Sequence, residues 1–319
     1  MLKVAVVGVG HFGREHARVY STPVGARLVA ICDLDEARGR AVAEEFRVPV
    51  ITNYRDLFGE VDAVSLAVPT ADHCRIACEL LDNGISVLVE KPVARTLEET
   101  DLMLAAAGRS GAILQVGHLE RFNPAVIAAR RIVTRPRFFE AHRLSVFTPR
   151  SLDIDVVMDL MIHDIDVVLS LTCAEVSEIR AAGIPILTPK VDIANARIEF
   201  DDGCVANLTA SRVSGERVRK LRFFQPHQYV SLDYTSQEAS AVSVERDSET
   251  AAWPRLSGGL IPVEKAEPLR LEIESFLRAV EGGPVEVDGS QGRRALELAL
   301  GVMERIHEHA KKAGVPIVD

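Results

Sequence analysis

The chain has 319 residues and a formal net charge of −9. That length predicts two domains, and the charge argues against nucleic acid or an anionic membrane as partner, because both require a basic surface. No apolar run approaches the ~18 residues of a membrane span, and none near the N-terminus suits a secretion signal. The five scattered cysteines suggest reduced side chains and predict no metal site. We therefore expect a soluble, cytoplasmic protein that acts on a small molecule.

A glycine-rich loop follows the first predicted strand, residues 2–7, and leads into a helical pattern. Strand, loop and helix in this order are the context of a dinucleotide-binding fingerprint. The first glycine permits a tight turn, the second lets a pyrophosphate approach the backbone, and the third lets the helix pack closely on the strand. The N-terminus of the helix offers N–H groups to the phosphates. The predicted nucleotide contacts here are Gly8, Gly10, His11, Phe12 and Gly13.

The second predicted strand, residues 27–32, ends in Asp33, twenty residues after Gly13. A carboxylate at this position suits the ribose 2′-hydroxyl of NAD and repels the 2′-phosphate of NADP. Residues 34–36 offer no arginine to such a phosphate, so the sequence favours NAD. The alternative, that Asp33 only caps the following helix, is compatible with either cofactor.

Apolar runs and helical patterns continue to alternate as far as residue 116. Single helices between strands imply right-handed crossovers and a doubly wound parallel sheet. The further strands are predicted at 48–51, 61–68, 87–89 and 112–116, and the helices at 41–46, 72–83 and 97–109. We therefore predict an α/β protein whose NAD-binding Rossmann domain spans residues 1–120.

The strand at 87–89 runs into Glu90, Lys91 and Pro92. Its end places a carboxylate and an ammonium at the carboxyl edge of the sheet, where open α/β sheets bind ligands. The simpler interpretation is that the pair only marks a solvated strand end. In the functional interpretation Lys91 faces the substrate, and Glu90 is a structural or cofactor-side partner.

After Gly117 the chain changes to long extended segments, 137–147 and 175–244, with a hairpin signal at 201–203. This pattern predicts a second, α+β domain over residues 121–319, built on an open and mainly antiparallel sheet. Two late helical stretches, 267–281 and 289–313, are predicted to be packing helices. Either can pack back on the first domain. An open sheet leaves one face to cover, so we expect a homodimer or homotetramer.

One helix, predicted at 154–171, interrupts the extended segments and carries Asp159 and His163. The spacing i, i+4 places both side chains on one face, about one turn apart. Alone, such a histidine is more often an ordinary surface or core residue than a base. The aspartates at 155, 164 and 166 are interpreted as a solvated stripe, the side of the helix that faces water.

The glycine loop, Glu90-Lys91-Pro92 and the pair Asp159/His163 occur in this order along essentially the full length, and the chain thereby resembles the Gfo/Idh/MocA oxidoreductases. The resemblance implies a Rossmann domain joined to an open-sheet domain, and nicotinamide-dependent chemistry on sugar or cyclitol carbons. It also implies that Lys91 and His163 line the reacting carbon with Asp159 beside them, and that the peptide before Pro92 is often cis.

The family's Pro-Asn pair after the fourth strand is Pro69-Thr70 here, while His73 is retained. By resemblance these three residues complete the predicted cofactor-binding set, together with Glu90 and Lys91. The departure at Thr70 affects contacts on the nicotinamide side more than the core mechanism.

Residues 117–124 look most like the branch that oxidises C3 of UDP-N-acetylglucosamine or its uronate to a 3-keto sugar. In that interpretation Arg121 pairs with the diphosphate and Asn123 bonds the sugar. Removing a hydride from a secondary alcohol also requires a base, which suits His163, while Lys91 stabilises the alkoxide and Asp159 orients His163 or the substrate. The alternatives are a dehydrogenase of a free sugar or inositol, and a non-catalytic NAD-binding sensor.

Overall fold

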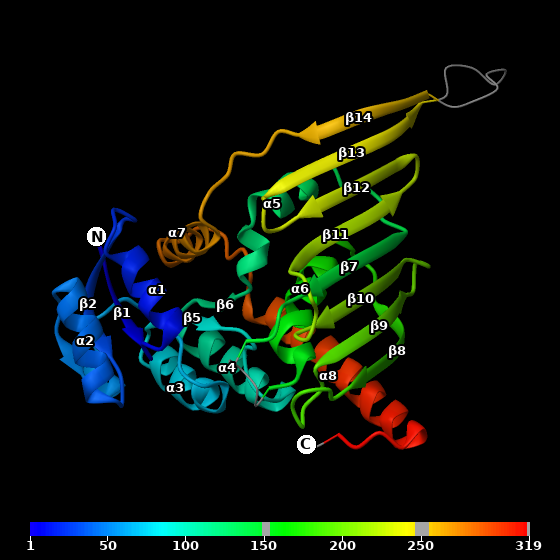
Figure 1. The fold of residues 1–319 in the computed structure, drawn as a ribbon. Helices are drawn as coiled ribbons and strands as arrows, with labels where there is room; N and C mark the ends of the chain where they lie inside the picture. The colour runs from blue at the N-terminus through cyan, green and yellow to red at the C-terminus, as the bar shows by residue number, and fades with distance from the viewer. Residues whose placement is uncertain (149–153, 246–254, 318–319) are drawn as a thin grey trace. The chain divides into compact units, whose positions relative to one another are not determined.

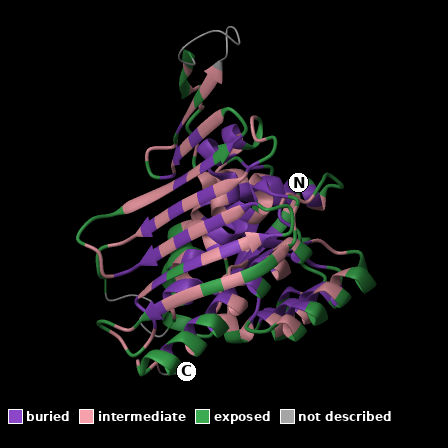
Figure 2. Ribbon diagram, turned by 90° about the vertical axis from the view of Figure 1, so that its right-hand side faces the viewer, coloured by how far each residue is buried: buried purple, intermediate pink, exposed green. Residues whose placement is uncertain are grey.

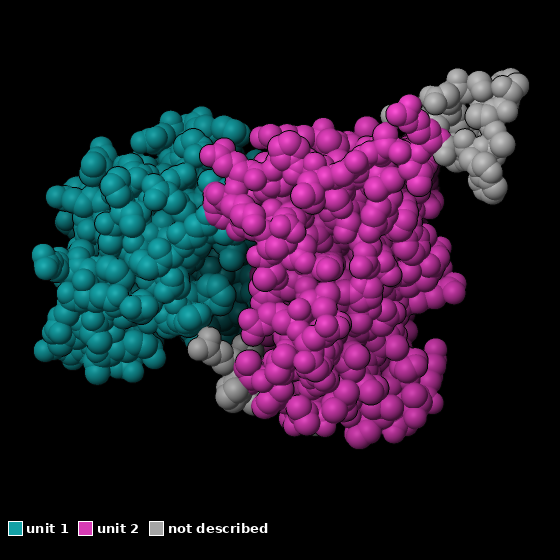
Figure 3. Space-filling view, turned by 45° about the horizontal axis from the view of Figure 1, so that its top comes forward, with its two compact units in different colours: residues 1–119, 267–296 teal, residues 120–266, 297–319 magenta. Residues whose placement is uncertain are grey.

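The structure, a computed structural model, describes residues 1–148, 154–245 and 255–317. The chain forms two compact units, shown in teal and magenta in Figure 3. The first contains residues 1–119 and 267–296, and the second contains residues 120–266 and 297–319. Among the described helices, none is both long and apolar enough to cross a membrane.

The first unit is built on a six-stranded sheet in the order β3-β2-β1-β4-β5-β6, in which all neighbours are parallel (Figure 1). Its strands are β1 (Leu2–Val7), β2 (Ala26–Cys32), β3 (Val50–Ile51), β4 (Ala63–Leu66), β5 (Ser86–Glu90) and β6 (Leu114–Gly117). The predicted doubly wound parallel sheet is thus confirmed. The strand order reverses between β1 and β4, the point at which such sheets bind ligands.

Helices pack on this sheet in two groups, α1 with α2 and α7, and α3 with α4. They are α1 (His11–Tyr20), α2 (Glu36–Phe46), α3 (Thr70–Asp82), α4 (Leu97–Ser110) and α7 (Pro268–Val280), with a short η1 (Tyr54–Leu57). Although α7 is distant in sequence, its Ile273 and Phe276 are buried in one core with Val4 and Val6 of β1. Each such side chain contributes roughly 1.5–3 kcal/mol on burial, so the first unit requires this late helix.

The second unit is built on an eight-stranded sheet in the order β14-β13-β12-β11-β7-β10-β9-β8. Its strands are β7 (Phe138–Leu144), β8 (Val176–Ile184), β9 (Ile193–Phe200), β10 (Val205–Ser211), β11 (Val218–Gln225), β12 (Gln228–Asp233), β13 (Glu238–Glu245) and β14 (Arg255–Ile261). Only β7 and β10 pair in parallel, which confirms the mainly antiparallel sheet. The sequence did not predict β14, because its two central glycines weaken a strand signal.

Buried and partly exposed residues alternate along the central strands, for example β7 and β10, as Figure 2 shows. The remaining helices are η2 (Leu119–Phe122), α5 (Pro124–Arg130), η3 (Val157–Met161), α6 (Ile162–Leu171) and α8 (Gly289–Ala313), the last running from the first unit into the second. η3 and α6 pack on β7 and β10, and α5 packs on β12 and β13.

The prediction of one regular α-helix over 154–171 is wrong in its first part. Val157–Met161 forms a π-helical turn, and the α-helix begins at Ile162. Such turns widen the helix by one residue and occur frequently at functional sites. Asp159 therefore lies in the π turn, while His163 lies in the first turn of α6.

Candidate active site

The glycine loop between β1 and α1 has the geometry that a nucleotide site requires. Gly8 has φ +84°, and a Cβ there would lie 2.7 Å from the Ala67 carbonyl oxygen. A Cβ at Gly13 would lie 1.8 Å from the oxygen of Gly8, so α1 can approach β1 only because that residue is glycine. A Cβ at Gly10 would have no neighbour within 4 Å. Gly10 therefore borders open space that a phosphate can enter.

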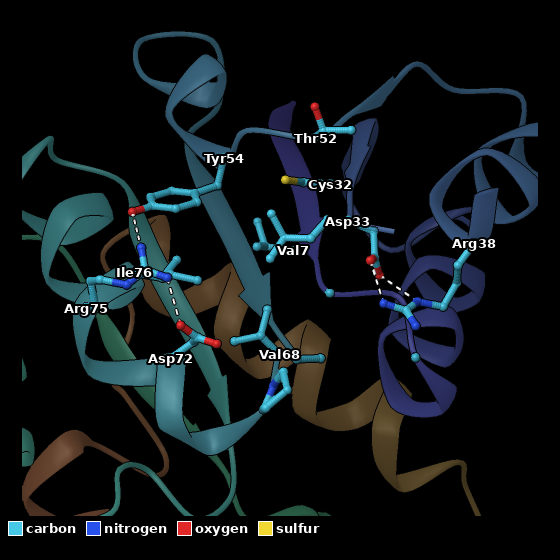
Figure 4. Close-up of a pocket in the computed structure, with 15 residues that line it drawn as sticks. Val7, Cys32, Asp33, Arg38, Thr52, Tyr54, Val68, Asp72, Arg75 and Ile76 are labelled. Atoms are coloured by element: carbon cyan, nitrogen blue, oxygen red, sulfur yellow. Dashed lines mark hydrogen bonds and ion pairs between the residues drawn. The ribbon is translucent and has the colours of Figure 1, made fainter. Parts of the chain in front are cut away.

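A cavity of about 440 Å³ lies in the first unit beside this loop (Figure 4). Gly8, Gly10, Asp33 and Pro69 are among its lining residues, and they come from the ends of β1, β2 and β4. This is the carboxyl edge of the sheet at its switch point, and the volume is in the range of small-molecule sites. The donor set and the space therefore fit a nicotinamide dinucleotide. The predicted contacts His11 and Phe12 are exposed at the start of α1.

Asp33 is buried, and its carboxylate holds the loop in place. It accepts hydrogen bonds from the backbone N–H of Val9 at 2.8 Å and of Asp35 at 2.9 Å. Arg38 donates two more, at 2.6 and 3.0 Å (Figure 4). Burial alone would raise the pKa of Asp33, but the bonds from Arg38 and the two amides outweigh it, so the pKa lies below its ordinary value.

The sequence argument that no arginine is at hand for a 2′-phosphate considered only residues 34–36. The structure extends it, because α2 turns Arg38 back onto Asp33 from five positions along the chain. The guanidinium lines the cavity and is half-exposed. A 2′-phosphate would consequently meet both a carboxylate and an arginine.

His73 is buried, and both of its ring nitrogens lie within hydrogen-bond distance of backbone carbonyl oxygens. Its Nδ1 lies 3.1 Å from the Pro92 oxygen, and its Nε2 lies 2.9 Å from the Val68 oxygen. Burial lowers the pKa of His73, while these carbonyls oppose the shift. The buried ring therefore links α3 to the segments that follow β4 and β5. Thr70, predicted beside it, is the first residue of α3 and is partly exposed.

Glu90, at the end of β5, is held by a histidine from α1. The Nε2 of His16 lies 2.9 Å from the Oε1 of Glu90, and its Nδ1 lies 3.0 Å from the hydroxyl of Ser65. Glu272 of α7 brings a second carboxylate within 4.8 Å of both groups. Burial alone would raise the pKa of Glu90, but the His16 bond and the nearby charge of Lys91 lower it overall. Glu90, whose side chain is 14% exposed, is thus stabilised as an anion at the end of β5.

Lys91 follows Glu90 directly at the carboxyl end of β5. Its backbone N–H lies 3.3 Å from the Oε2 of Glu90, and its side chain is partly exposed. The Lys91–Pro92 peptide is cis, as the resemblance implied. Glu90 thereby holds the backbone from which the lysine projects.

In the second unit, Asp159 and His163 are both partly exposed on successive turns of η3 and α6. The structure thus places these two predicted residues on adjacent turns within the same unit. The apolar residues around them are buried, including Val157, Met161 and Ile165. The turn that carries the two polar groups is anchored by this apolar face.

The expected solvated stripe is wrong for Asp164 and Asp166, which are both buried. Arg143 of β7 donates to Asp164 at 2.7 and 3.0 Å, and to Glu120 at 2.9 Å. Asp166 lies 3.5 Å from Arg121. These aspartates fix α6 to the sheet because a buried carboxylate requires a charged partner.

The predicted substrate residues Arg121 and Asn123 are also buried. Arg121 is 3% exposed and faces Asp166, while Asn123 caps α5 by accepting from the Ala125 amide. The amide group of Asn123 donates to Glu120 and to the Tyr234 carbonyl oxygen. Both side chains therefore have internal roles in the second unit, and direct contact with substrate remains a prediction.

Sequence reasoning did not identify Arg38, His16 or Arg143 as part of the site. Arg38 had a detectable signal, since it lies one helical turn beyond the N-terminal cap of α2. His16 and Arg143 had none, because their carboxylate partners lie 74 and 21 residues away. Contacts of this kind arise only from the folded topology.

Two family models match the chain. One, described as an oxidoreductase family with an NAD-binding Rossmann fold, matches residues 2–118, and the GFO/IDH/MocA C-terminal domain matches residues 126–225. The chain therefore belongs to the Gfo/Idh/MocA family of oxidoreductases.

Individual relatives are dehydrogenases of sugars and cyclitols. The chain is 39% identical to UDP-N-acetylglucosamine 3-dehydrogenase of Acidithiobacillus ferrooxidans, over 94% of this chain and 96% of that protein. A solved structure of that enzyme aligns with a TM-score of 0.90 at 38% identity, covering 96% of this chain and 98% of the other. The scyllo-inositol 2-dehydrogenase (NAD(+)) of Bacillus subtilis is 31% identical, over 67% of this chain and 68% of that relative.

Proposed function

We propose that the protein oxidises C3 of UDP-N-acetylglucosamine, or of its uronate, to a 3-keto sugar with NAD as oxidant. The observation that carries this proposal is similarity to a UDP-N-acetylglucosamine 3-dehydrogenase over 94% of the chain, through both units. The similarity to the inositol dehydrogenase of Bacillus subtilis covers only 67%.

The proposal assigns three residues to the chemistry. His163 removes the hydroxyl proton, Lys91 stabilises the negative charge that develops on that oxygen, and Asp159 orients His163 or the substrate. When bound, NAD accepts the hydride that leaves the same carbon. The partial exposure of all three side chains supports these roles, because each can be reached by a ligand.

For the cofactor, we propose that NAD is preferred over NADP. Asp33 at the end of β2 supports this choice, because its carboxylate can accept the ribose 2′-hydroxyl. Arg38 weakens the discrimination, since it would partly compensate the carboxylate's repulsion of a 2′-phosphate. We therefore expect a preference for NAD rather than complete exclusion of NADP.

The competing functions are a dehydrogenase of free inositol or sugar, favoured by the inositol-dehydrogenase relatives, and a non-catalytic NAD sensor. A sensor needs neither Lys91 nor Asp159 nor His163. All three retained residues therefore support an enzyme, and the higher identity to the nucleotide-sugar dehydrogenase, 39% against 24% for an inositol 2-dehydrogenase of similar coverage, supports the nucleotide sugar.

The test is NADH formation at 340 nm with purified protein, NAD and, in turn, UDP-N-acetylglucosamine, its uronate, glucose and myo-inositol. An amine or a transaminase traps the ketone, because a 3-keto product is unfavourable at equilibrium. We expect turnover of the nucleotide sugars only. Turnover of inositol or glucose without the nucleotide sugars would refute the substrate assignment.

His163→Ala should lower turnover by about 10²–10⁴-fold, the usual contribution of a general base, while NAD affinity stays within about twofold. His142→Ala is the matched control, since that histidine lies on β7 and is given no role in the reaction. Unchanged turnover in the His163 variant would remove this residue from the mechanism.

We also propose that the protein is a homo-oligomer assembled through one face of the eight-stranded sheet, the face opposite the one on which α6 packs. An aromatic cluster of Phe138, Phe224 and Tyr229 lies on neighbouring strands, and Phe224 is 39% exposed. Such apolar groups on a sheet face favour association. Analytical ultracentrifugation should show a dimer or tetramer, and Phe224→Glu should shift it toward the monomer.

A further inference from the structure

Two arginines lie opposite one another on neighbouring strands of the second unit. β11 pairs with β7 so that Arg219 lies directly across from Arg143. Residues in this relation share one face of the sheet, with Cβ atoms about 5 Å apart. The bonds from Arg143 to Asp164 of α6 identify that face as the one that carries α6. Like charges placed in this way destabilise a sheet.

The other cations of β11 are paired with acids. Arg222 lies opposite Glu140 on β7, and their side chains are 3.0 Å apart. Lys220 lies opposite Asp233 on β12, at 3.6 Å. Unlike Lys220 and Arg222, Arg219 therefore lies opposite another cation. It also lies on the face of the sheet that carries α6. Departures from local pairing are expected where a protein binds a ligand.

The carboxylates near Arg143 are already occupied. Both oxygens of Asp164 accept from Arg143, and the two oxygens of Glu120 accept from Arg143 and Asn123. The side chain of Arg219 makes no hydrogen bond or ion pair with any described residue, and its Nε is buried. Burial and the charge of Arg143 lower the pKa of Arg219. Binding of an external anion would offset both the cost of burying the Arg219 charge and its repulsion by Arg143.

We propose that Arg219 binds the diphosphate of the nucleotide-sugar substrate. Asp164, the partner of Arg143, directly follows His163, so Arg219 lies on the strand next to the one that anchors the catalytic turn. Arg219 is partly exposed and reachable. A guanidinium binds diphosphate oxygens through paired N–H groups, which makes arginine the suitable cation. The inference rests on the proposed function and names the residue that recognises the nucleotide half.

The experiment measures UDP binding by calorimetry, which requires no turnover, in the wild-type protein and in Arg219→Gln and Arg222→Gln. Arg222 is the matched control because it has the same side chain on the same strand, with a carboxylate partner. We expect Arg219→Gln to weaken UDP binding by about 10–100-fold and Arg222→Gln to leave it within about twofold. The melting temperature of Arg219→Gln should stay unchanged or rise, since a like-charge repulsion is removed.

Equal UDP affinity in wild type and Arg219→Gln would overturn the inference, as would a lower melting temperature without loss of UDP binding. A higher KM of Arg219→Gln for a sugar uronate, with UDP binding unchanged, would instead assign the residue to a carboxylate and also overturn it. If UDP binding depends on Arg219 but UDP-N-acetylglucosamine yields no NADH, the anion site stands and the proposed reaction fails.

Discussion

The two units organise their polar groups in different ways. In the first, the glycine loop and Asp33 are held mostly by backbone amides and by residues close in sequence, such as Arg38. In the second, the turn that carries His163 is anchored by a buried ion pair between Asp164 and Arg143 of β7. The Asp33 carboxylate is therefore held largely by backbone amides, whereas the turn that carries His163 depends on buried ion pairs between side chains.

The strongest test of this comparison is Arg143→Met in the second unit. The change leaves the buried Asp164 and the partly buried Glu120 without their cation, so the free energy of unfolding should fall by about 3–5 kcal/mol. Urea unfolding followed by circular dichroism measures it. Arg222→Met, which breaks a more exposed pair, should cost less than about 1 kcal/mol. Equal losses of unfolding free energy in the two variants would contradict a special role for the cluster of Arg143, Asp164 and Glu120.

In the first unit, Asp33→Asn should weaken the binding of NAD. It removes a charged acceptor for the ribose hydroxyl but leaves an oxygen for the Val9 amide, so NAD affinity should fall by about 10–100-fold. Fluorescence titration with NADH checks this. Asp35→Asn is the control, because Asp35 is exposed and caps α2. A similar loss in both variants would show that the effect comes from the helix cap.

The smallest effect is expected for His16→Leu. It removes the hydrogen bond to Glu90, and the unfolding free energy at pH 7 should fall by about 1–2 kcal/mol. Since the folded pKa of Glu90 is lowered, its contribution is complete above the ordinary value of 4.5 and is lost as the pH falls through the folded pKa. The difference between variant and wild type should therefore shrink in acid. A difference that is constant from pH 7 to pH 3 would contradict this pairing.

Much of the fold could be predicted from the sequence because its signals are local. Parallel strands separated by single helices, the glycine spacing and Asp33 all appear within short windows, and they identified the Rossmann unit and its ligand edge. The position of Lys91 at a strand end, and the spacing of Asp159 and His163 by about one turn, were also readable. The errors include the π turn around Asp159 and the supposed exposure of Asp164 and Asp166.

The sequence by itself thus determined the family, the doubly wound parallel sheet of the nucleotide unit and the candidate chemical groups. Only the tertiary structure decided that α7 completes the first core, that His16 holds Glu90, and that Arg219 lies opposite Arg143. The physical reason is that a buried charge must find its partner wherever the topology brings one. Sheet pairing joins residues as far apart in the chain as Phe138 and Phe224, beyond any local pattern.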